Sequence, residues 1–177
     1  SSSARILSCW GMFVGLSFQT IDIEANGELA ARFREDSYVV SFGTATAFQK
    51  MGAQAYLEWL RNRIAAYPEG HVHVWVGETI VGQIEARPHK TDSAIGYVNL
   101  YYLVPSYRRM GIGVLLDQYV TEYFLRLGRS RIQLSVSPSN LGAWDFYLSR
   151  GYVDRGQRED APEVHRMERL MNDSPRS

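Results

Sequence analysis

The sequence predicts a single α/β or α+β domain, and three observations carry this prediction. Segments in which apolar residues alternate are interspersed with segments in which they recur at helical spacing. A hydrophobic content of 45% with 12% aromatic residues is typical of a folded globular protein. The 177 residues suit one core, and no repeat or low-complexity tract interrupts them. The expected order of elements is β-α-α-β-β-β-α-β-α-β-β.

The first third of this domain is expected to hold one strand and two helices. A strand is predicted at 17–23, where Asn26-Gly27 follows as a break. One helical pattern lies near 28–36 and a stronger one at 52–67, ended by Pro68 and Gly70. The residues that recur at helical spacing in the stronger pattern are Tyr56, Leu57, Leu60 and Ile64.

The middle of the chain predicts three strands. Two β-rich runs, 71–76 and 80–87, flank Gly77-Glu78 in the manner of a hairpin. A third run, 94–104, is rich in Tyr, Val and Leu and ends at Pro105. We expect these runs to form neighbouring strands of one sheet.

The last part of the domain predicts two helices and three strands. A helix is expected at 113–127, where four apolar residues share one face and Gly128 follows the end. The segment 131–136 alternates as a strand does, and a short helix at 140–150 is closed by Gly151. Two further strands are expected at 152–157 and 164–171.

Both ends of the chain are expected to lie outside the domain, which we place at 17–171. Residues 1–16 carry an apolar run that is too short and too interrupted to span a membrane, and no clear cleavage site follows it. We interpret 1–16 as an N-terminal extension in which Met12 is close to the natural start and 1–11 is upstream or added sequence. Residues 172–177 are expected to be a polar tail.

Charge and cysteine content exclude several classes of function. Lys plus Arg and Asp plus Glu are equal at 19 each, so no overall field draws the chain to a nucleic acid or an anionic membrane. The single cysteine, Cys9, cannot form an intramolecular disulfide or hold a metal alone. We therefore expect a cytoplasmic protein with no nucleic-acid or membrane partner, and a homodimer stays open.

The stretch PSYRRMGIG, residues 105–113, joins a predicted strand to a predicted helix. A helix start exposes unpaired N–H groups and a partial positive charge, and Gly111 and Gly113 let an anion approach the backbone. Arg108 and Arg109 add full charges, which favours a phosphate or pyrophosphate site. The Gly-Lys-Ser/Thr ending of a P-loop and the third glycine of a dinucleotide fingerprint are missing. A plain surface turn is the alternative.

A second segment, 135–153, places polar groups on one helical stripe. Asn140 and Tyr147 are two turns apart, or about 10 Å, and therefore face the same way together with Ala143 and Trp144. Core packing alone would also explain such a stripe.

The two segments together resemble the GCN5-related N-acetyltransferase (GNAT) family. Residues 108–113 are similar to its acyl-CoA motif Q/R-x-x-G-x-G/A, and 103–107 to the strand-Pro-x-Tyr segment that precedes it. The resemblance extends over 17–171 and is specific within 94–153. The second family motif, N-x-x-A-x-x-F-Y-x-x-x-G-F/Y, matches Asn140, Ala143, Phe146, Tyr147, Gly151 and Tyr152.

This resemblance implies an acyl-CoA N-acyltransferase fold: a central mixed, mostly antiparallel sheet, splayed at two central strands, with helices on both faces. Acyl-CoA would lie where the strand ending at Val104 and the strand 131–136 separate. The strand would bind pantetheine through its backbone, and the turn 109–114 would bind the pyrophosphate. The residues implied to bind the cofactor are Tyr101, Tyr102, Leu103, Arg108, Arg109, Met110, Gly111, Ile112, Gly113, Val114, Asn140 and Tyr147.

The implied reaction is acetyl transfer from acetyl-CoA to a primary amine of a small molecule or peptide, by direct attack in a ternary complex. Tyr147 is the expected general acid, because a phenol with a pKa near 10 is protonated at neutral pH and can donate to the departing thiolate. Its alternative role is packing on the cofactor. A non-catalytic acyl-CoA binding or sensing domain is the alternative function.

The general base is less defined. Many family members use a glutamate on the central strands, and here Glu85 is the only carboxylate inside a predicted central strand. The alternative is a water molecule relayed by Ser135, Asn99 or a backbone carbonyl. His71 and His73 lack a third ligand, so no metal is expected.

The resemblance also implies that the loops 36–48 and 154–163 wall the acceptor pocket. Their acidic residues would attract a cationic amine, or would simply be solvated. The acidic residues concerned are Glu35, Asp36, Glu159, Asp160 and Glu163, and aromatic walls are expected from Trp75, Tyr97, Tyr101 and Tyr102.

Overall fold

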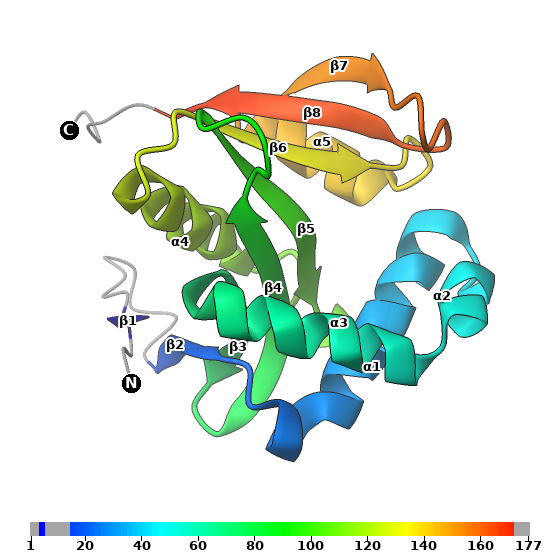
Figure 1. Ribbon diagram of the computed structural model, residues 1–177, viewed down its shortest axis with the longest axis vertical. Coiled ribbons are helices and arrows are strands. Elements are labelled where there is room, and N and C mark those ends of the chain that lie inside the picture. The colour runs from blue at the N-terminus through cyan, green and yellow to red at the C-terminus, as the bar shows by residue number, and fades with distance from the viewer. Residues whose placement is uncertain (1–3, 6–14, 172–177) are drawn as a thin grey trace.

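The computed structural model describes residues 4–5 and 15–171, which form one eight-stranded sheet with helices packed against it (Figure 1). The strand order is β1-β2-β3-β4-β5-β6-β8-β7, and only the β5–β6 pair is parallel. The strands are β1 (Ala4–Arg5), β2 (Leu16–Thr20), β3 (His71–Val76), β4 (Thr79–Pro88), β5 (Ile95–Leu103), β6 (Arg131–Val136), β7 (Val153–Gln157) and β8 (His165–Leu170). The helices are α1 (Ile23–Phe42), α2 (Thr46–Met51), α3 (Ala53–Ala66), α4 (Ile112–Arg126) and α5 (Leu141–Ser149), with short 3-10 turns η1 (Pro68–Gly70) and η2 (Pro105–Tyr107).

The predicted mixed, mostly antiparallel sheet with helices on both faces is confirmed. Helices α1 and α3 pack on one face of the central strands, where the ring of Tyr102 meets Phe33 of α1. Helices α4 and α5 pack on the other face, where Tyr101 meets Asp117 of α4. Of the extension expected at 1–16, Met12 lies outside the described residues, as does the tail 172–177.

The predicted splay of the two central strands is also confirmed. Strands β5 and β6 pair over four rungs only, from Ile95–Arg131 to Val98–Leu134, while β5 continues to Leu103 in contact with β4. At the point of separation Asn99 is an extra residue, because Leu100 lies opposite Glu85 and Val98 opposite Ala86. The half of β5 beyond this bulge therefore presents one free backbone edge.

The predictions for the first third of the domain were partly wrong. The strand expected at 17–23 ends at Thr20, and the helix expected at 28–36 spans 23–42. Asn26 was read as a break and is a kink within α1, with φ −127° and ψ 19°. Gly27 is buried within α1, and a Cβ there would make an ordinary contact with Leu57 of α3, at 3.7 Å. The loop expected at 36–48 is largely helical, since it contains the end of α1 and the start of α2.

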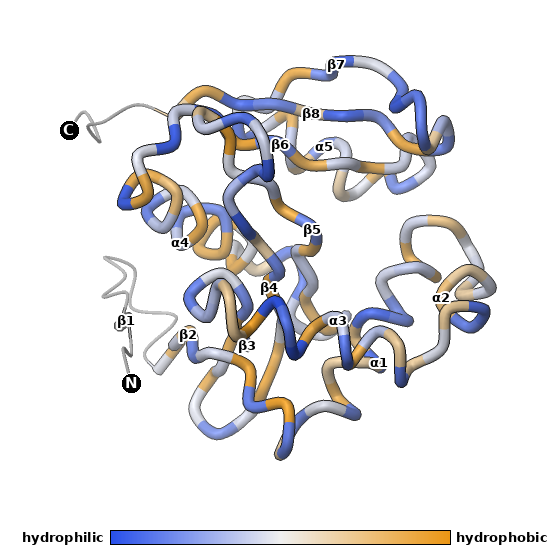
Figure 2. The backbone as a smooth tube through the Cα atoms, in the orientation of Figure 1, coloured by the Kyte–Doolittle hydropathy of each residue, from blue (hydrophilic) through white to orange (hydrophobic). Residues whose placement is uncertain are grey.

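The largest core lies between the sheet and the pair α4 and α5. Helix α4 buries Ile112, Leu116, Val120 and Phe124, and strand β6 contributes alternate residues, beginning with Ile132. Figure 2 shows the corresponding alternation of hydrophobic and hydrophilic residues along α4. A smaller core between α1, α2 and α3 includes Phe48, Tyr56 and Leu60. The first core fixes α4 against β5 and so fixes the join between them.

We predict that Gly96→Ala lowers the free energy of unfolding by about 1–3 kcal/mol, because a Cβ at this position would lie 2.3 Å from the ring of Phe124. Urea denaturation measures this as a lower midpoint. Gly142→Ala in α5 is the control, since its Cβ would have no neighbour within 4 Å. An unchanged midpoint for Gly96→Ala would show that α4 is not held this closely to β5.

Candidate functional site

The open edge of β5 is the first component of the site. The N–H of Val104 donates to the carbonyl of Val81 on β4, at 2.8 Å. Backbone groups alternate in direction along an antiparallel strand, so Tyr102 also directs its backbone to β4. Tyr101 and Leu103 direct theirs to the side that β6 has left. Of the three residues expected to bind a ligand through the backbone, two present groups to the opening.

The turn between β5 and α4 is the second component. Arg109 and Gly111 both adopt left-handed conformations, with φ 61° and 83°. The helix that follows has no side-chain cap at Gly111 and no acidic residue in its first turn. Its first N–H groups, at 112–114, therefore combine with the helix dipole into an uncompensated positive end. Such an end is suited to binding an anion.

The two glycines of this turn have different roles. Gly111 is needed for its left-handed φ, and a Cβ there would meet nothing within 4 Å. Gly113 is needed for packing, because a Cβ there would lie 3.2 Å from Phe146 of α5. The sequence suggested close approach of an anion for both, and the structure adds helix packing as a role of Gly113.

The two arginines of the turn also differ. Arg108 lies back along the end of β5, where its Nε donates to the carbonyl of Leu103 at 2.7 Å. Its Nη2 is 3.5 Å from Asp36 of α1, and its guanidinium stacks 5.4 Å from the ring centre of Tyr102. Arg109 is exposed and forms no ion pair within residues 15–171. Arg109 is thus the free positive charge beside the helix start.

Tyr147 of α5 packs near Tyr101, which lies in the open half of β5. Its ring centre is 6.3 Å from that of Tyr101 on β5 and 5.5 Å from that of Tyr152. Burial, and secondarily the charge of Asp117, raise the pKa of the Tyr147 phenol well above its ordinary value of 10. The phenol is therefore a proton-bearing donor throughout the physiological range.

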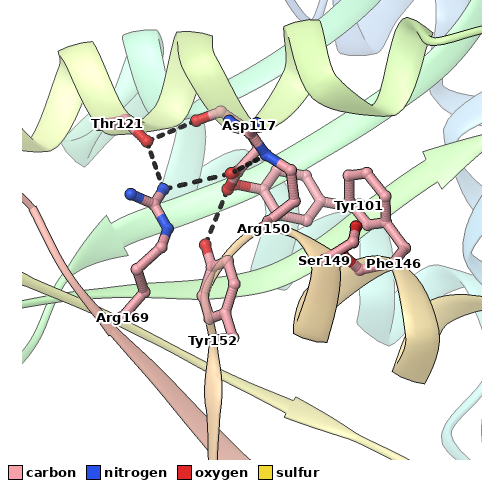
Figure 3. Close-up of polar contacts among 8 residues, drawn as sticks. All are labelled: Tyr101, Asp117, Thr121, Phe146, Ser149, Arg150, Tyr152 and Arg169. Carbon is pink, nitrogen blue, oxygen red and sulfur yellow. Dashed lines mark hydrogen bonds and ion pairs between the residues drawn. The ribbon is translucent and has the colours of Figure 1, made fainter. Parts of the chain in front are cut away.

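The fully buried carboxylate of Asp117 organises this face of the sheet (Figure 3). It accepts hydrogen bonds from Tyr101 at 3.2 Å and Tyr152 at 2.7 Å. It also pairs with Arg150 at 2.9 Å and Arg169 at 3.2 Å. These donors come from β5, from the segment after α5 and from β8, so one charge ties four parts of the fold together. Sequence reasoning missed Asp117, although a charge beside the apolar stripe of its helix was the available signal.

Asn140 caps α5 rather than lying on its stripe. Its Oδ1 accepts a hydrogen bond from the N–H of Ala143 at 3.3 Å. The amide nitrogen is the group that remains to donate to a ligand. The Asn-x-x-Ala pattern therefore has a structural component in addition to the binding role that the resemblance implies.

On the opposite face of the sheet, Glu85 belongs to a buried polar network. It accepts hydrogen bonds from Tyr56 at 2.5 Å and Gln83 at 2.9 Å, and its side chain is fully buried. Arg34 of α1 lies 3.5 Å from Glu85 and donates to the backbone carbonyl of Asn99 at 3.2 Å. The candidate base is thus engaged in holding the bulge.

His71 and His73 lie at the edge of this network and have structural partners. His71 Nδ1 is 2.9 Å from the carbonyl of Tyr67, and His73 Nε2 is 2.8 Å from Gln83 Oε1. Burial lowers the pKa of both imidazoles, so both rings are neutral at pH 7. Among the residues that the structure describes, no three His, Cys, Asp or Glu side chains are grouped as metal ligands.

The acidic residues expected near an acceptor are mostly paired. Asp36 accepts a hydrogen bond from the Tyr102 hydroxyl, and Glu35 accepts one from Gln49. Asp160 forms an ion pair with Arg158. Asp36 and Asp160 have cationic partners, Arg108 and Arg158, so the attraction that these two acids would exert on a cationic amine is weakened. Trp75 lies on β3 near the β3–β4 turn, apart from the open edge of β5.

Comparison with known proteins places these components in context. The sequence model of the acetyltransferase (GNAT) family matches residues 28–152. No curated protein in the comparison matches the chain. Among the helices of the described residues, none combines the length and apolar character that crossing a bilayer requires.

Solved structures with low sequence identity share the fold. The PaiA N-acetyltransferase of Thermoplasma acidophilum, crystallised with coenzyme A, is 17% identical with a TM-score of 0.72, over 89% of this chain and 99% of that chain. Ard1 of Thermoplasma volcanium is 19% identical with a TM-score of 0.70, over 90% and 100%. The spermidine N-acetyltransferase of Vibrio cholerae, crystallised with CoA and spermine, is 15% identical with a TM-score of 0.68, over 89% and 96%.

We predict that Glu85→Gln destabilises the protein by about 3–5 kcal/mol, because it leaves the charge of Arg34 without its buried partner. Chemical denaturation measures the loss. Glu78→Gln, at an exposed position in the β3–β4 turn, is the control and should leave the midpoint unchanged. Equal midpoints for the two variants would contradict the structural role assigned to Glu85.

Proposed function

The chain belongs to the acetyltransferase (GNAT) family, and from this premise we propose that it acetylates a primary amine by direct attack on acetyl-CoA within a ternary complex. The observation that carries the proposal is the alignment of two components. The open edge of β5 leads directly to the uncapped positive start of α4. A ligand with amide groups at one end and phosphates at the other fits both, and coenzyme A has this chemistry.

Each part of the cofactor has proposed partners. The pantetheine amides pair with backbone groups of Tyr101 and Leu103, and the amide nitrogen of Asn140 donates to the same arm. The pyrophosphate meets the N–H groups of 112–114, with Arg109 as the adjacent charge. The carbonyl of Leu103 accepts one hydrogen bond from Arg108, and its second lone pair is available to the pantetheine.

In the proposed reaction the neutral amine attacks the thioester carbon, a C–N bond forms and the C–S bond breaks. The departing thiolate needs a donor, and Tyr147 is the buried donor beneath the opening. Because the phenol pKa lies above that of a thiol, near 8.5, Tyr147 stabilises the thiolate chiefly through a strong hydrogen bond. The proton that the amine loses is transferred to the thiolate, which leaves as the neutral thiol of CoA.

We place the acceptor amine at the bulge around Asn99, where β5 and β6 separate. Glu85 already accepts two hydrogen bonds and pairs with Arg34, so we assign it a structural role and not the role of the base. The side-chain carbonyl of Asn99 is buried without a hydrogen-bond partner at the point where β5 and β6 separate. This oxygen accepts a hydrogen bond from the N–H of the attacking amine. A water molecule at Ser135 then carries the proton away from the amine.

We predict that Tyr147→Phe lowers kcat for release of free CoA by a factor of about 10²–10⁴, because the thiolate loses its donor. Thiol release from acetyl-CoA with a panel of primary amines measures the rate, and the melting-temperature rise caused by acetyl-CoA measures binding. Tyr119→Phe is the control: this buried tyrosine of α4 donates to the carbonyl of Glu69. Equal rates for Tyr147→Phe and wild type would remove Tyr147 from the mechanism.

We predict that Arg109→Glu weakens CoA binding roughly tenfold through repulsion of the pyrophosphate. Binding of a pantetheine fragment without phosphates should change little, and calorimetry with both ligands measures the difference. Arg126→Glu makes the same charge change at the other end of α4 and should affect neither ligand. Equal losses for CoA and the fragment would contradict the pyrophosphate assignment.

A further inference from the structure

The face of the sheet opposite α4 and α5 carries a fixed arginine beside the opening. Tyr97 of β5 and Ser135 of β6 meet across the last rungs of the paired region, with their hydroxyl oxygens 2.8 Å apart. Arg158, which follows β7, donates from Nη1 to Ser135 at 3.1 Å and to Tyr97 at 3.4 Å. One edge of its guanidinium is thereby attached to both central strands.

The other edge of this guanidinium holds a carboxylate. Nε and Nη2 of Arg158 donate to the two oxygens of Asp160, at 3.0 and 2.5 Å. This is the paired geometry in which arginine recognises carboxylates most strongly. The Asp160 side chain is 68% exposed and that of Arg158 only 24% exposed. The arginine is therefore the fixed member of the pair, and the loop carboxylate is the one that can leave.

Further positive charge surrounds this pair. Arg87 of β4 stacks on Tyr97, with its guanidinium carbon 5.6 Å from the ring centre. Arg166 of β8 lies opposite Ser135 in the ladder and is exposed. The hydrogen bond from Arg158 lowers the pKa of Asp160, and the charge of Arg166 contributes to the same effect. The charge of Glu163 also contributes to raising the pKa of Arg158, and Asp160 is the acid that is hydrogen-bonded to this arginine.

The position of Arg158 relates it to the amine. Tyr97 precedes the Asn99 bulge by two residues, or roughly 7 Å along a strand. Because Arg158 is hydrogen-bonded to Tyr97, we use this spacing as the scale for the separation between a carboxylate on Arg158 and an amine at Asn99. Molecules that combine the two groups a few bonds apart match this spacing.

We propose that the acceptor carries a carboxylate a few bonds from its primary amine, and that Arg158 binds this carboxylate in place of Asp160. The inference rests on the proposed acetyl transfer and names the acceptor class for that site. Asp160 is then a built-in competitor that holds the guanidinium in its binding geometry. This assignment replaces the sequence-based expectation that Asp160 attracts a cationic amine.

The test compares amino carboxylates with their uncharged amides: glycine and glycinamide, β-alanine and β-alaninamide, and 4-aminobutyrate and its amide. Short peptides with an acidic or a neutral second residue, and spermidine as an acceptor without a carboxylate, complete the panel. For wild type we expect kcat/KM at least tenfold higher for the carboxylate of the preferred pair. Preference for acidic peptides would place the carboxylate on a peptide side chain rather than on a small amino acid.

Four variants separate recognition from fold. Arg158→Gln should raise KM for the carboxylate about tenfold and leave the amide unchanged, and Arg158→Lys should lie between it and wild type, because it keeps the charge without the paired geometry. Asp160→Asn should lower KM for the carboxylate, since the competitor is gone. Arg155→Gln is the matched control: it is exposed and pairs with Glu168 on β8, away from the opening. Melting temperatures check that each variant is folded.

The outcomes distinguish the two levels of the proposal. Amides or spermidine preferred by wild type, or Asp160→Asn raising KM for amines, would overturn the carboxylate site while leaving acetyl transfer intact. No thiol release with any amine would overturn the proposed transfer. In that case calorimetry of the same carboxylates on CoA-loaded wild type and Arg158→Gln still tests the site, and equal heats for the two proteins would reject it.

Discussion

The loss of pairing between β5 and β6 beyond Val98 and Leu134 is the feature on which the site depends. Ending a ladder inside a sheet leaves backbone donors and acceptors without partners, and buried backbone groups are rarely left so. Arg108 satisfies one of them by donating to Leu103. The remaining groups form an edge that an extended ligand can complete, much as an added strand would. The open edge of β5 is thus a consequence of the incomplete pairing of the sheet.

Such an opening must be held from both faces, because the strands would otherwise pair fully. On one face the carboxylate of Asp117 draws β5, α4 and β8 toward one point. On the other face Glu85 and Arg34 form a buried pair, and Arg34 donates a hydrogen bond to the backbone carbonyl of Asn99. The carboxylates of Asp117 and Glu85 are both buried, and the free-energy cost of removing them from water is offset only while their partners are in place. These two networks make the separation of the strands a defined geometry instead of a frayed end.

The sequence predicts where the turn before α4 and the helix α5 lie, and it does not predict the buried networks that support them. The positions of Gly111 and Tyr147 follow from local patterns, because a turn and a helical stripe depend on near neighbours in the chain, whereas Asn140 was expected on the stripe and caps α5. The partners of Asp117 are up to 52 residues away, and no local pattern records them. Helix α1 was also misread: Asn26-Gly27 is typical of turns, but the helix begins before it, with Asp22 as its cap, and passes through it with a kink at Asn26.

The acceptor side shows why charge composition is a weak guide to specificity. The loops beside the opening contain several acids, which suggests attraction of a cation. Their partners reverse this reading, because Asp160 neutralises Arg158 while Arg158 is anchored to Ser135 and Tyr97. The exposed carboxylate of Asp160 occupies the outer edge of the anchored Arg158, and it therefore blocks a site for another carboxylate. The group available to a second substrate depends on which member of the Arg158–Asp160 pair can move. Arg158 is the anchored member, so the group that stays beside the opening is a cation.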